Sequence, residues 1–262
     1  MRNIRRYDSI ALLGAFWAIL CPLSGSASST PLSVKNIVLV HGAFADATSW
    51  AKVVPLLESR GFHVVAVQNP LTSLGDDVAA TRRAIALQQG PVLLVAHSWG
   101  GVVITQAGDD PKVVGLVYVS AYAPSAGQSG NDASSPYGWT EGQKQIRLDD
   151  SKFATVTFQG VSEDIAQRLS VADQRLFFAT QGQSYGPMFD EKIDVAAWTK
   201  KPSWVLISTN DRMLPPAMER DEVTKLKPID TRTLSTGHMS IQEEPVKVAE
   251  FIESATKYLS TH

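Results

Sequence analysis

Short, nearly continuous runs of β-branched and other apolar residues recur along the chain, separated by stretches with mixed polar and apolar positions. Continuous apolar runs of this length are typical of parallel strands that are buried on both faces of a sheet. The pattern predicts six strands, over residues 36–40, 63–67, 91–96, 113–119, 204–208 and 231–234.

The stretches between these runs have helical spacing. Apolar residues recur every three or four positions, as they do on the buried face of a surface helix. Helices are predicted over residues 50–59, 76–89, 99–107, 216–226 and 245–258. Strands that alternate with helices indicate a mostly parallel central sheet with helices on both faces, which is the α/β class.

The alternation fails between residues 123 and 201. This stretch begins with a loop-like segment over residues 124–130, and its pieces at 162–169 and 172–180 are compatible with helices. Long irregular connections within a domain are usually functional. Residues 124–201 are therefore expected to form a helical cap insertion within one domain that spans residues 28–262.

The N-terminus has the order of a secretory signal peptide. Three arginines lie among the first six residues, an apolar run follows over 10–20, and small residues lead to Ala27. This order predicts a signal peptide over residues 1–27, cleaved after Ala27, and a periplasmic or secreted protein. The apolar run is short for a bilayer span, so no stable membrane anchor is expected, although an uncleaved anchor is the alternative.

Only one cysteine occurs, Cys21, and it lies within the predicted leader. The mature protein is therefore expected to have no disulfide, no thiolate nucleophile and no cysteine metal site. Cys21 is also an alternative point of lipid attachment, although Leu20 is large for that role. A twin-arginine export route, through Arg5 and Arg6, is a further alternative.

Composition narrows the class of protein. The chain has 262 residues, of which 44% are hydrophobic and 19% charged, with a net charge of −2. These values are typical of a globular domain with a large core, and they argue against nucleic acid as the main partner. The histidines are scattered, with no ligand spacing among His, Asp and Glu, so no metal is expected. A homodimer is compatible with the sequence.

The segment AHSWGG, residues 96–101, joins a predicted strand to a predicted helix. A serine on such a sharp turn projects its hydroxyl above the sheet, and the helix start beside it presents backbone N–H groups. Ser98 is the candidate nucleophile, and the Trp99 N–H is a candidate donor to an oxyanion. Ala96 stands where the G-x-S-x-G pattern has glycine. The alternative is that Ser98 only caps the helix.

A second oxyanion signature follows the first predicted strand, in the segment HGAF at residues 41–44. Loops of this kind supply a backbone N–H opposite the nucleophile. Ala43 is the expected donor, and Phe44 is the alternative. His41 is expected to shape this loop, and His97 is likewise expected to be structural.

The catalytic base should lie late in the chain, because the triad order on such a fold is Ser, then Asp or Glu, then His. Only His238 and His262 follow Ser98, and His262 is the chain terminus. His238 lies between the last predicted strand and the last helix, after Gly237, which allows a tight loop. His238 is therefore the candidate base.

Asp211 is the candidate acid. It follows the predicted strand 204–208, and a carboxylate at the carboxyl end of a strand lies in the expected crevice of an open α/β sheet. The alternative is that Asp211 only caps the helix that follows Pro215. Asp190 and Asp194 are rival acids within the insertion.

The segments VHGAFADATSW, AHSWGG, YVSAYAP, NDRMLPP and GHMSIQEEP together resemble one branch of the α/β-hydrolase fold family. This branch contains EstC-like bacterial esterases, plant methylesterases and plant hydroxynitrile lyases. The resemblance covers residues 36–259 and is weakest across the insertion. It implies hydrolysis of carboxylic esters, a helical cap and no cofactor. In the lyases a lysine follows the base histidine, whereas this chain has Met239, as the esterases do.

The expected function is therefore a serine carboxylesterase that acts on small apolar or aromatic esters through an acyl-enzyme. A lyase or lactone hydrolase on the same fold, and a ligand-binding module without activity, are the alternatives. The side chains expected to bind substrate, each of which could instead be ordinary core, are Phe44, Tyr122, Trp139 and Met239, with Trp99, Phe177 and Phe178 as further candidates.

Overall fold

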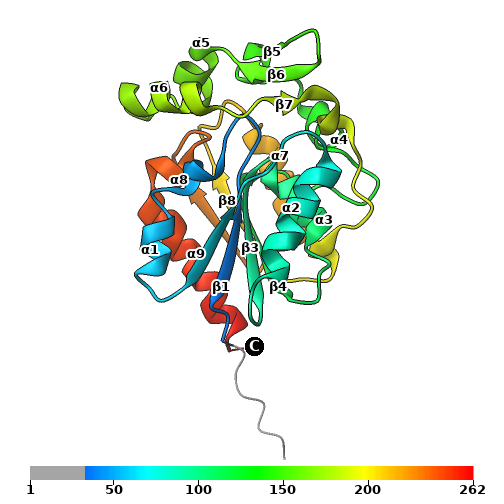
Figure 1. Ribbon diagram of the computed structural model, residues 1–262, viewed down its shortest axis with the longest axis vertical. Helices are drawn as coiled ribbons and strands as arrows, with labels where there is room; N and C mark the ends of the chain where they lie inside the picture. The colour runs from blue at the N-terminus through cyan, green and yellow to red at the C-terminus, as the bar shows by residue number, and fades with distance from the viewer. Residues whose placement is uncertain (1–32, 262) are drawn as a thin grey trace, which may run out of the picture. The chain divides into compact units, whose positions relative to one another are not determined.

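The computed structural model describes residues 33–261, and a six-stranded parallel sheet lies at the centre of this part of the chain (Figure 1). The predicted leader, Cys21 and His262 lie outside the described residues. The strand order is β2-β1-β3-β4-β8-β9. Each strand begins and ends within two residues of its prediction: β1 (Asn36–Val40), β2 (His63–Val67), β3 (Val92–Ser98), β4 (Val113–Ala121), β8 (Ser203–Ser208) and β9 (Asp230–Leu234).

Helices cover both faces of this sheet. One face carries α2 (Leu74–Ala86), α3 (Gly100–Ala107) and α7 (Pro216–Leu226), and the other carries α1 (Val54–Glu58) and α9 (Pro245–Leu259) (Figure 1). Successive side chains of a strand point to opposite faces. Val92, Leu94 and Ala96 of β3 accordingly enter one core and Leu93 and Val95 the other, and all five are fully buried. This double burial explains why β3 reads as a continuous apolar run.

The predicted helix 50–59 is instead two short elements. A 3-10 turn, η1 (Ala47–Trp50), comes first, and the Asp46 carboxylate caps it by accepting the Thr48 N–H. Helix α1 begins only at Val54. Pro55 is the reason, because proline is tolerated in the first turn of an α-helix but not in its interior. A short helix that the sequence did not predict, α8 (Ser240–Glu243), precedes α9.

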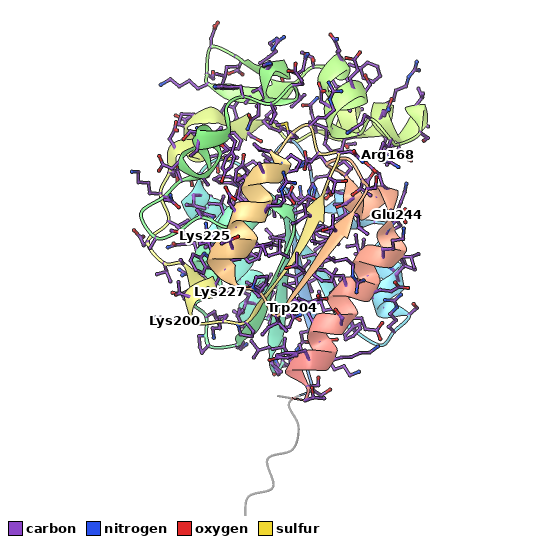
Figure 2. The ribbon with its side chains drawn as sticks, turned by 180° about the vertical axis from the view of Figure 1, so that it is seen from behind. Arg168, Lys200, Trp204, Lys225, Lys227 and Glu244 are labelled. Atoms are coloured by element: carbon purple, nitrogen blue, oxygen red, sulfur yellow. The ribbon has the colours of Figure 1, made fainter. Side chains whose placement is uncertain are left out.

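The last helix seals its face of the sheet at the end away from the cap. Val248, Phe251 and Ile252 of α9 are fully buried, as helical spacing requires for one face. Near the start of β8, the ring of Trp204 meets that of Tyr258 at 5.7 Å between centroids (Figure 2).

The insertion between β4 and β8 forms a cap over one end of the sheet (Figure 1). It was expected to be helical, but it also contains an antiparallel sheet of β5 (Ile146–Leu148), β6 (Phe153–Val156) and β7 (Ser184–Tyr185). The predicted helix 162–169 is a short π-helix, η4 (Val161–Ile165). The other elements are α4 (Gly130–Ser134), α5 (Phe158–Gly160), α6 (Val171–Thr180), η2 (Ser135–Tyr137), η3 (Gln143–Gln145), η5 (Gly186–Asp190) and η6 (Ala197–Thr199).

Candidate functional site

The turn at Ser98 is sharp and conformationally costly. Strand β3 ends at Ser98 and α3 begins at Gly100, so the chain reverses within two residues. Ser98 has φ of 53°, a left-handed conformation that costs a non-glycine residue about 1–3 kcal/mol. A Cβ on Gly100 would lie 2.5 Å from the Val40 carbonyl oxygen, so the close approach of β1 requires glycine there. Such strain is kept where the surrounding structure enforces it, as at functional sites.

Ser98 does not act as a helix cap. The N-cap position of α3 is occupied by Trp99, and no side chain makes a capping hydrogen bond there. The capping alternative for the serine is therefore wrong, and its hydroxyl is left to face the cavity described below.

His238 and Asp211 are hydrogen-bonded to each other. Nδ1 of His238 lies 2.7 Å from Oδ2 of Asp211, and both residues are buried. The other carboxylate oxygen accepts the backbone N–H groups of Met213, at 2.7 Å, and Leu214, at 2.8 Å. The carboxylate is thus fixed from both sides. Because Nδ1 donates to it, the Nε2 atom of His238 is the ring nitrogen that remains for base chemistry.

The alternatives for the acid do not fit this arrangement. Helix α7 begins after Pro215, so Asp211 is not its cap. Asp190 and Asp194 are both exposed in the cap, and Asp190 accepts a hydrogen bond from Asn131 at 2.7 Å.

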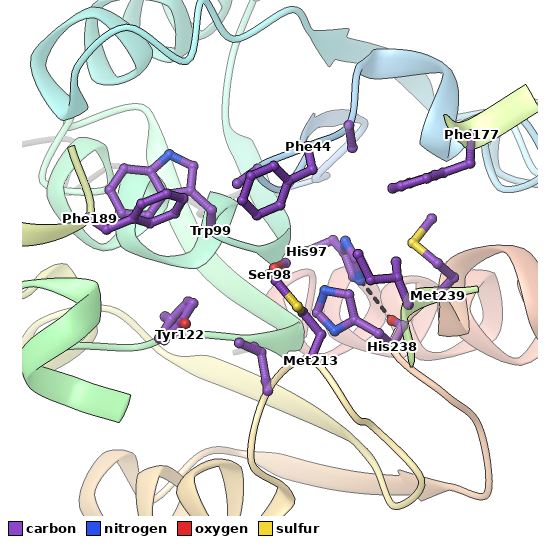
Figure 3. A pocket seen from close by; sticks show the side chains of 14 residues that line it. Phe44, His97, Ser98, Trp99, Tyr122, Phe177, Phe189, Met213, His238 and Met239 are labelled. Atoms are coloured by element: carbon purple, nitrogen blue, oxygen red, sulfur yellow. Dashed lines mark hydrogen bonds between the residues drawn. The ribbon is translucent and has the colours of Figure 1, made fainter. Parts of the chain in front are cut away.

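Ser98 and His238 line the same small cavity, of about 30 Å³ (Figure 3). Its wall is mostly apolar. The predicted Ala43, Phe44, Trp99, Tyr122, Phe177 and Met239 all lie there, together with residues that the sequence did not indicate: Ala45, His97, Ile165, Phe189, Met213 and Leu214.

Two predicted substrate contacts lie elsewhere. Trp139 lines a second and larger cavity, of about 690 Å³, and is 74% exposed. Phe178 is absent from both walls and meets Phe158 at 5.5 Å between ring centroids. The residues that the two cavities share are Phe44, Tyr122, Phe189 and Met213. The two cavities therefore adjoin each other at these four residues.

The loop after β1 packs directly against the serine. A Cβ on Gly42 would lie 2.7 Å from Ser98 Cβ and 3.2 Å from its Oγ, so only glycine allows this approach. The two predicted oxyanion donors, the backbone N–H groups of Ala43 and Phe44, differ in their contacts. The Phe44 N–H donates to Ser184 Oγ of the cap at 3.1 Å, whereas Ala43 lies at the cavity wall.

The two other buried histidines hold backbone in place. His41 Nδ1 donates to the Gly42 carbonyl at 2.7 Å, while its Nε2 accepts the Asn69 N–H at 3.0 Å. His97 Nε2 donates to the carbonyl of His238 at 2.8 Å. Burial lowers the pKa of both imidazoles, so both are neutral near pH 7.

The cap is fastened to both loops that carry the acid and the base. Gln167 donates to the Asn210 carbonyl at 3.0 Å. Arg168 donates to the Ser235 carbonyl and lies 3.4 Å from the Glu243 carboxylate (Figure 2). That carboxylate accepts the Gly237 N–H at 3.0 Å. The Gln167 and Arg168 contacts were not predicted because each joins segments far apart in the chain.

Over residues 33–261, no group of three or more His, Cys, Asp and Glu side chains is placed to hold a metal ion. Within the same range, no helix is long and apolar enough to cross a membrane.

Known proteins resemble the chain in sequence over part of their length. It is 32% identical over 152 residues to a Phoma sp. protein named "Probable hydrolase R7", which covers 50% of this chain and 62% of that protein. It is 32% identical over 109 residues to a pyrethroid hydrolase of Sphingobium wenxiniae, covering 37% of this chain and 39% of that one. For Methylesterase 8 of Arabidopsis thaliana the identity is 29% over 133 residues, covering 44% and 48%. The matches thus span from about two fifths to three fifths of these relatives.

Solved structures match over more of the chain. Polyneuridine aldehyde esterase superposes with a TM-score of 0.76 and 18% identity, covering 85% of this chain and 99% of that one. At such identity the likeness shows the fold. The alpha/beta hydrolase family matches residues 37–251, which is most of the chain. The fold predicted from the sequence is therefore confirmed, and the chain belongs to the alpha/beta hydrolase family.

Proposed function

We propose that this protein is a serine carboxylesterase in which Ser98 is the nucleophile, His238 the base and Asp211 the acid. One observation carries the proposal: a histidine that is hydrogen-bonded to a buried carboxylate lines the same cavity as a serine on a strained strand-to-helix turn. Nucleophile, base and orienting acid in this order are the parts that acyl transfer needs.

The chemistry follows from these positions. His238 Nε2 takes the proton of Ser98 as Oγ attacks the ester carbonyl, and Asp211 stabilises the imidazolium that forms. The imidazolium then protonates the leaving alcohol, which leaves an acyl group on Ser98. A water molecule, deprotonated by His238, attacks the acyl carbonyl, and the carboxylic acid is released as the proton returns to Oγ.

Two backbone N–H groups are proposed to stabilise the tetrahedral oxyanion. The Trp99 N–H follows the nucleophile at the start of α3, where backbone donors and the helix dipole favour negative charge. Ala43 is the proposed second donor. The engagement of the Phe44 N–H with Ser184 supports Ala43 over Phe44.

The sizes of the two cavities favour esters with one small and one bulky part. The cavity beside Ser98 has room for only about two water-sized groups, so a small substituent fits there. The neighbouring cavity of about 690 Å³ is in the range of ordinary ligand sites. We propose that Phe44, Tyr122 and Met239 contact the part of the ester near Ser98 and that Trp139 contacts the bulkier part.

A hydroxynitrile lyase of Arabidopsis thaliana is also a relative, 31% identical over 104 residues. The site argues against that reaction here. Met239 follows the candidate base, is buried, and lines the cavity, and no lysine or arginine contributes to the wall. A cyanide leaving group would therefore find no cation beside His238, whereas neutral ester hydrolysis needs none.

Hydrolysis of p-nitrophenyl acetate and butyrate by the wild type and Ser98→Ala tests the proposal. The wild type should turn over both esters and Ser98→Ala should not. The exposed Ser59, whose hydroxyl donates to the Leu56 carbonyl, gives the control: Ser59→Ala should keep the wild-type rate. Wild-type rates in Ser98→Ala would exclude Ser98 as nucleophile, and an inactive wild type would favour the ligand-binding alternative.

We also propose that the protein acts in the periplasm or outside the cell, on the basis of residues 1–27. The N-terminal mass of the protein recovered after expression in a host with an intact secretion system tests this. A start at Ser28 is expected. An unprocessed Met1 start in the cytoplasmic fraction would contradict it.

A further inference from the structure

A buried carboxylate on α2 holds the side chain next to the candidate nucleophile. Asp77 is fully buried, and its Oδ2 accepts the indole Nε1–H of Trp99 at 2.8 Å. Its Oδ1 accepts the backbone N–H of Leu71, also at 2.8 Å. Trp99 is itself fully buried. Both oxygens of this carboxylate therefore accept hydrogen bonds from protein N–H groups.

No cation neutralises Asp77 among the ion pairs formed by residues 33–261. The charged groups that face it are Asp76, from its own helix, and Glu191, from the cap, and both are acids. Burial raises the pKa of Asp77 to about 6. A buried carboxylate without a cation carries a desolvation cost, which its two hydrogen bonds offset only in part.

Trp99 lies directly after the strained residue Ser98 and just before the first residue of α3. The residue before it has the left-handed φ of 53°, and no side chain caps the helix that starts after it. Its indole is held on two sides. Asp77 accepts the Nε1–H at one edge, and the ring of Phe189 meets it edge-on at 5.2 Å between centroids (Figure 3).

The anchor of Asp77 continues into the cap. Leu71, which gives its N–H to Asp77, accepts the Tyr185 N–H of β7 on its carbonyl at 2.8 Å. The Leu74 N–H at the start of α2 donates to Glu191 at 2.9 Å. The cap thus holds both ends of the segment 71–74, and this segment fixes the Asp77 carboxylate. The fixed carboxylate in turn holds the Trp99 indole in one place.

We propose that Asp77 is a positioning residue, which fixes the Trp99 indole and thereby aims the Trp99 backbone N–H at the oxyanion formed on Ser98. This role rests on the proposed function. It explains why an uncompensated carboxylate is kept in the core: it acts on the transition state, through a backbone donor, and not on the ground-state contacts that bind the substrate.

The test compares Asp77→Asn with Asp76→Asn, which makes the same change one residue away at an exposed position. An asparagine can accept only one of the two hydrogen bonds through its oxygen. Loss of a whole oxyanion donor costs about 100- to 1000-fold in rate, so a misplaced donor should lower kcat by about 10-fold or more. KM for p-nitrophenyl butyrate should stay within about twofold, because ground-state contacts are unchanged. Asp76→Asn should retain the wild-type kcat and KM.

Two further readouts separate positioning from mere stability. Each rate is divided by the fraction of sites that react with a fluorophosphonate, so unfolded protein does not count. The ratio of the wild-type kcat to the Asp77→Asn kcat should decrease as the pH is lowered past 6, because a protonated Asp77 resembles asparagine. Trp99→Phe, which removes the indole donor, should lower kcat similarly, and the double variant should be no slower than either single variant.

The outcomes are distinct. A kcat per labelled site within twofold of wild type in Asp77→Asn, with only a lower unfolding midpoint, would overturn the positioning role. If Asp77→Asn does not fold, Trp99→Phe alone decides by the same criterion. Failure of the proposed function would look different, because the wild type would then neither label at Ser98 nor turn over ester.

Discussion

Arg212, the residue after the candidate acid, forms an ion pair with Asp164 of the cap, with Nε 2.7 Å from Oδ1. Asp164 is almost fully buried, whereas half of the Arg212 side chain is exposed. Together with the Gln167 and Arg168 contacts, this pair ties the cap to the loops of Asp211 and His238. The cap therefore shapes the substrate cavities and also limits the movement of the acid and the base.

Breaking this ion pair should lower activity more than stability. Asp164→Ala frees the loop after Asp211, so kcat for p-nitrophenyl butyrate should fall about 10-fold, since small misplacements of catalytic groups are costly. Arg212 can be rehydrated, so the free energy of unfolding should fall by only about 1 kcal/mol. Initial rates and urea denaturation measure the two effects.

Glu163→Ala is the control for that variant, because Glu163 is an exposed neighbour whose carboxylate accepts a hydrogen bond from Gln159 and forms no ion pair with Arg212. It should leave kcat unchanged. Equal loss of kcat in both variants would show that η4 as a whole, and not the ion pair, supports the acid loop.

His97 is expected to support the base through its backbone. His97→Ala removes the donor to the His238 carbonyl and leaves that buried oxygen unsatisfied, which costs about 1–3 kcal/mol. The kcat should fall with it. His97→Gln can supply an amide N–H in place of Nε2–H and should recover part of both losses. If Gln and Ala variants were equally slow, the hydrogen bond would not be what positions His238.

Trp139 should select for substrate size, because it lines the larger cavity and not the one beside Ser98. Trp139→Ala should raise KM for a naphthyl ester several-fold and leave KM for p-nitrophenyl acetate unchanged. Leu148 and Ile146 share that wall, so the loss of one side chain leaves the cavity intact. Equal effects on both esters would place the bulky group of the substrate elsewhere.

The stability of the fold should depend on pH through Glu222. This buried carboxyl accepts the Ala123 N–H at 2.7 Å, and burial raises its pKa to about 7. Since the folded-state pKa exceeds the unfolded value near 4.5, the folded state binds more protons between these values. Stability is then lost as pH rises from about 4.5 to 7, by at most about 1.4 kcal/mol per pH unit.

Glu222→Gln removes this dependence. Its free energy of unfolding relative to wild type should increase with pH across that window and level off above pH 7. Urea denaturation at pH 5, 6, 7 and 8 measures the difference. A difference that stays constant with pH would mean that the carboxyl titrates alike in both states.

Strands β1, β3, β4 and β8 could be predicted because they are buried on both faces, so each one is a continuous apolar run, whereas the edge strand β9 is mostly exposed and polar. The candidate site could be predicted because parallel strands bring their carboxyl ends to one edge. Ser98 ends β3, Asp211 follows β8 and His238 follows β9, and these are the places where side chains from distant segments meet.

The cap could not be read in the same way. Its strands β5, β6 and β7 have two to four residues each and are held by pairing with one another, which no local periodicity records. Phe189 reaches the cavity from the short 3-10 helix η5 and Met213 from a loop, and neither segment has a periodicity that the sequence reveals. Asp77 looks like an ordinary acid in the first turn of a helix, and only its contact with Trp99, 22 residues away, shows otherwise.

Peptide mass spectrometry after reaction with a fluorophosphonate directly tests Ser98, His238 and Asp211 as nucleophile, base and acid. One adduct is expected, on Ser98, that forms rapidly in the wild type, slowly in His238→Ala and Asp211→Asn, and not at all in Ser98→Ala. An adduct on another residue, or labelling of Ser98 at the same rate when the histidine is replaced, would contradict these roles.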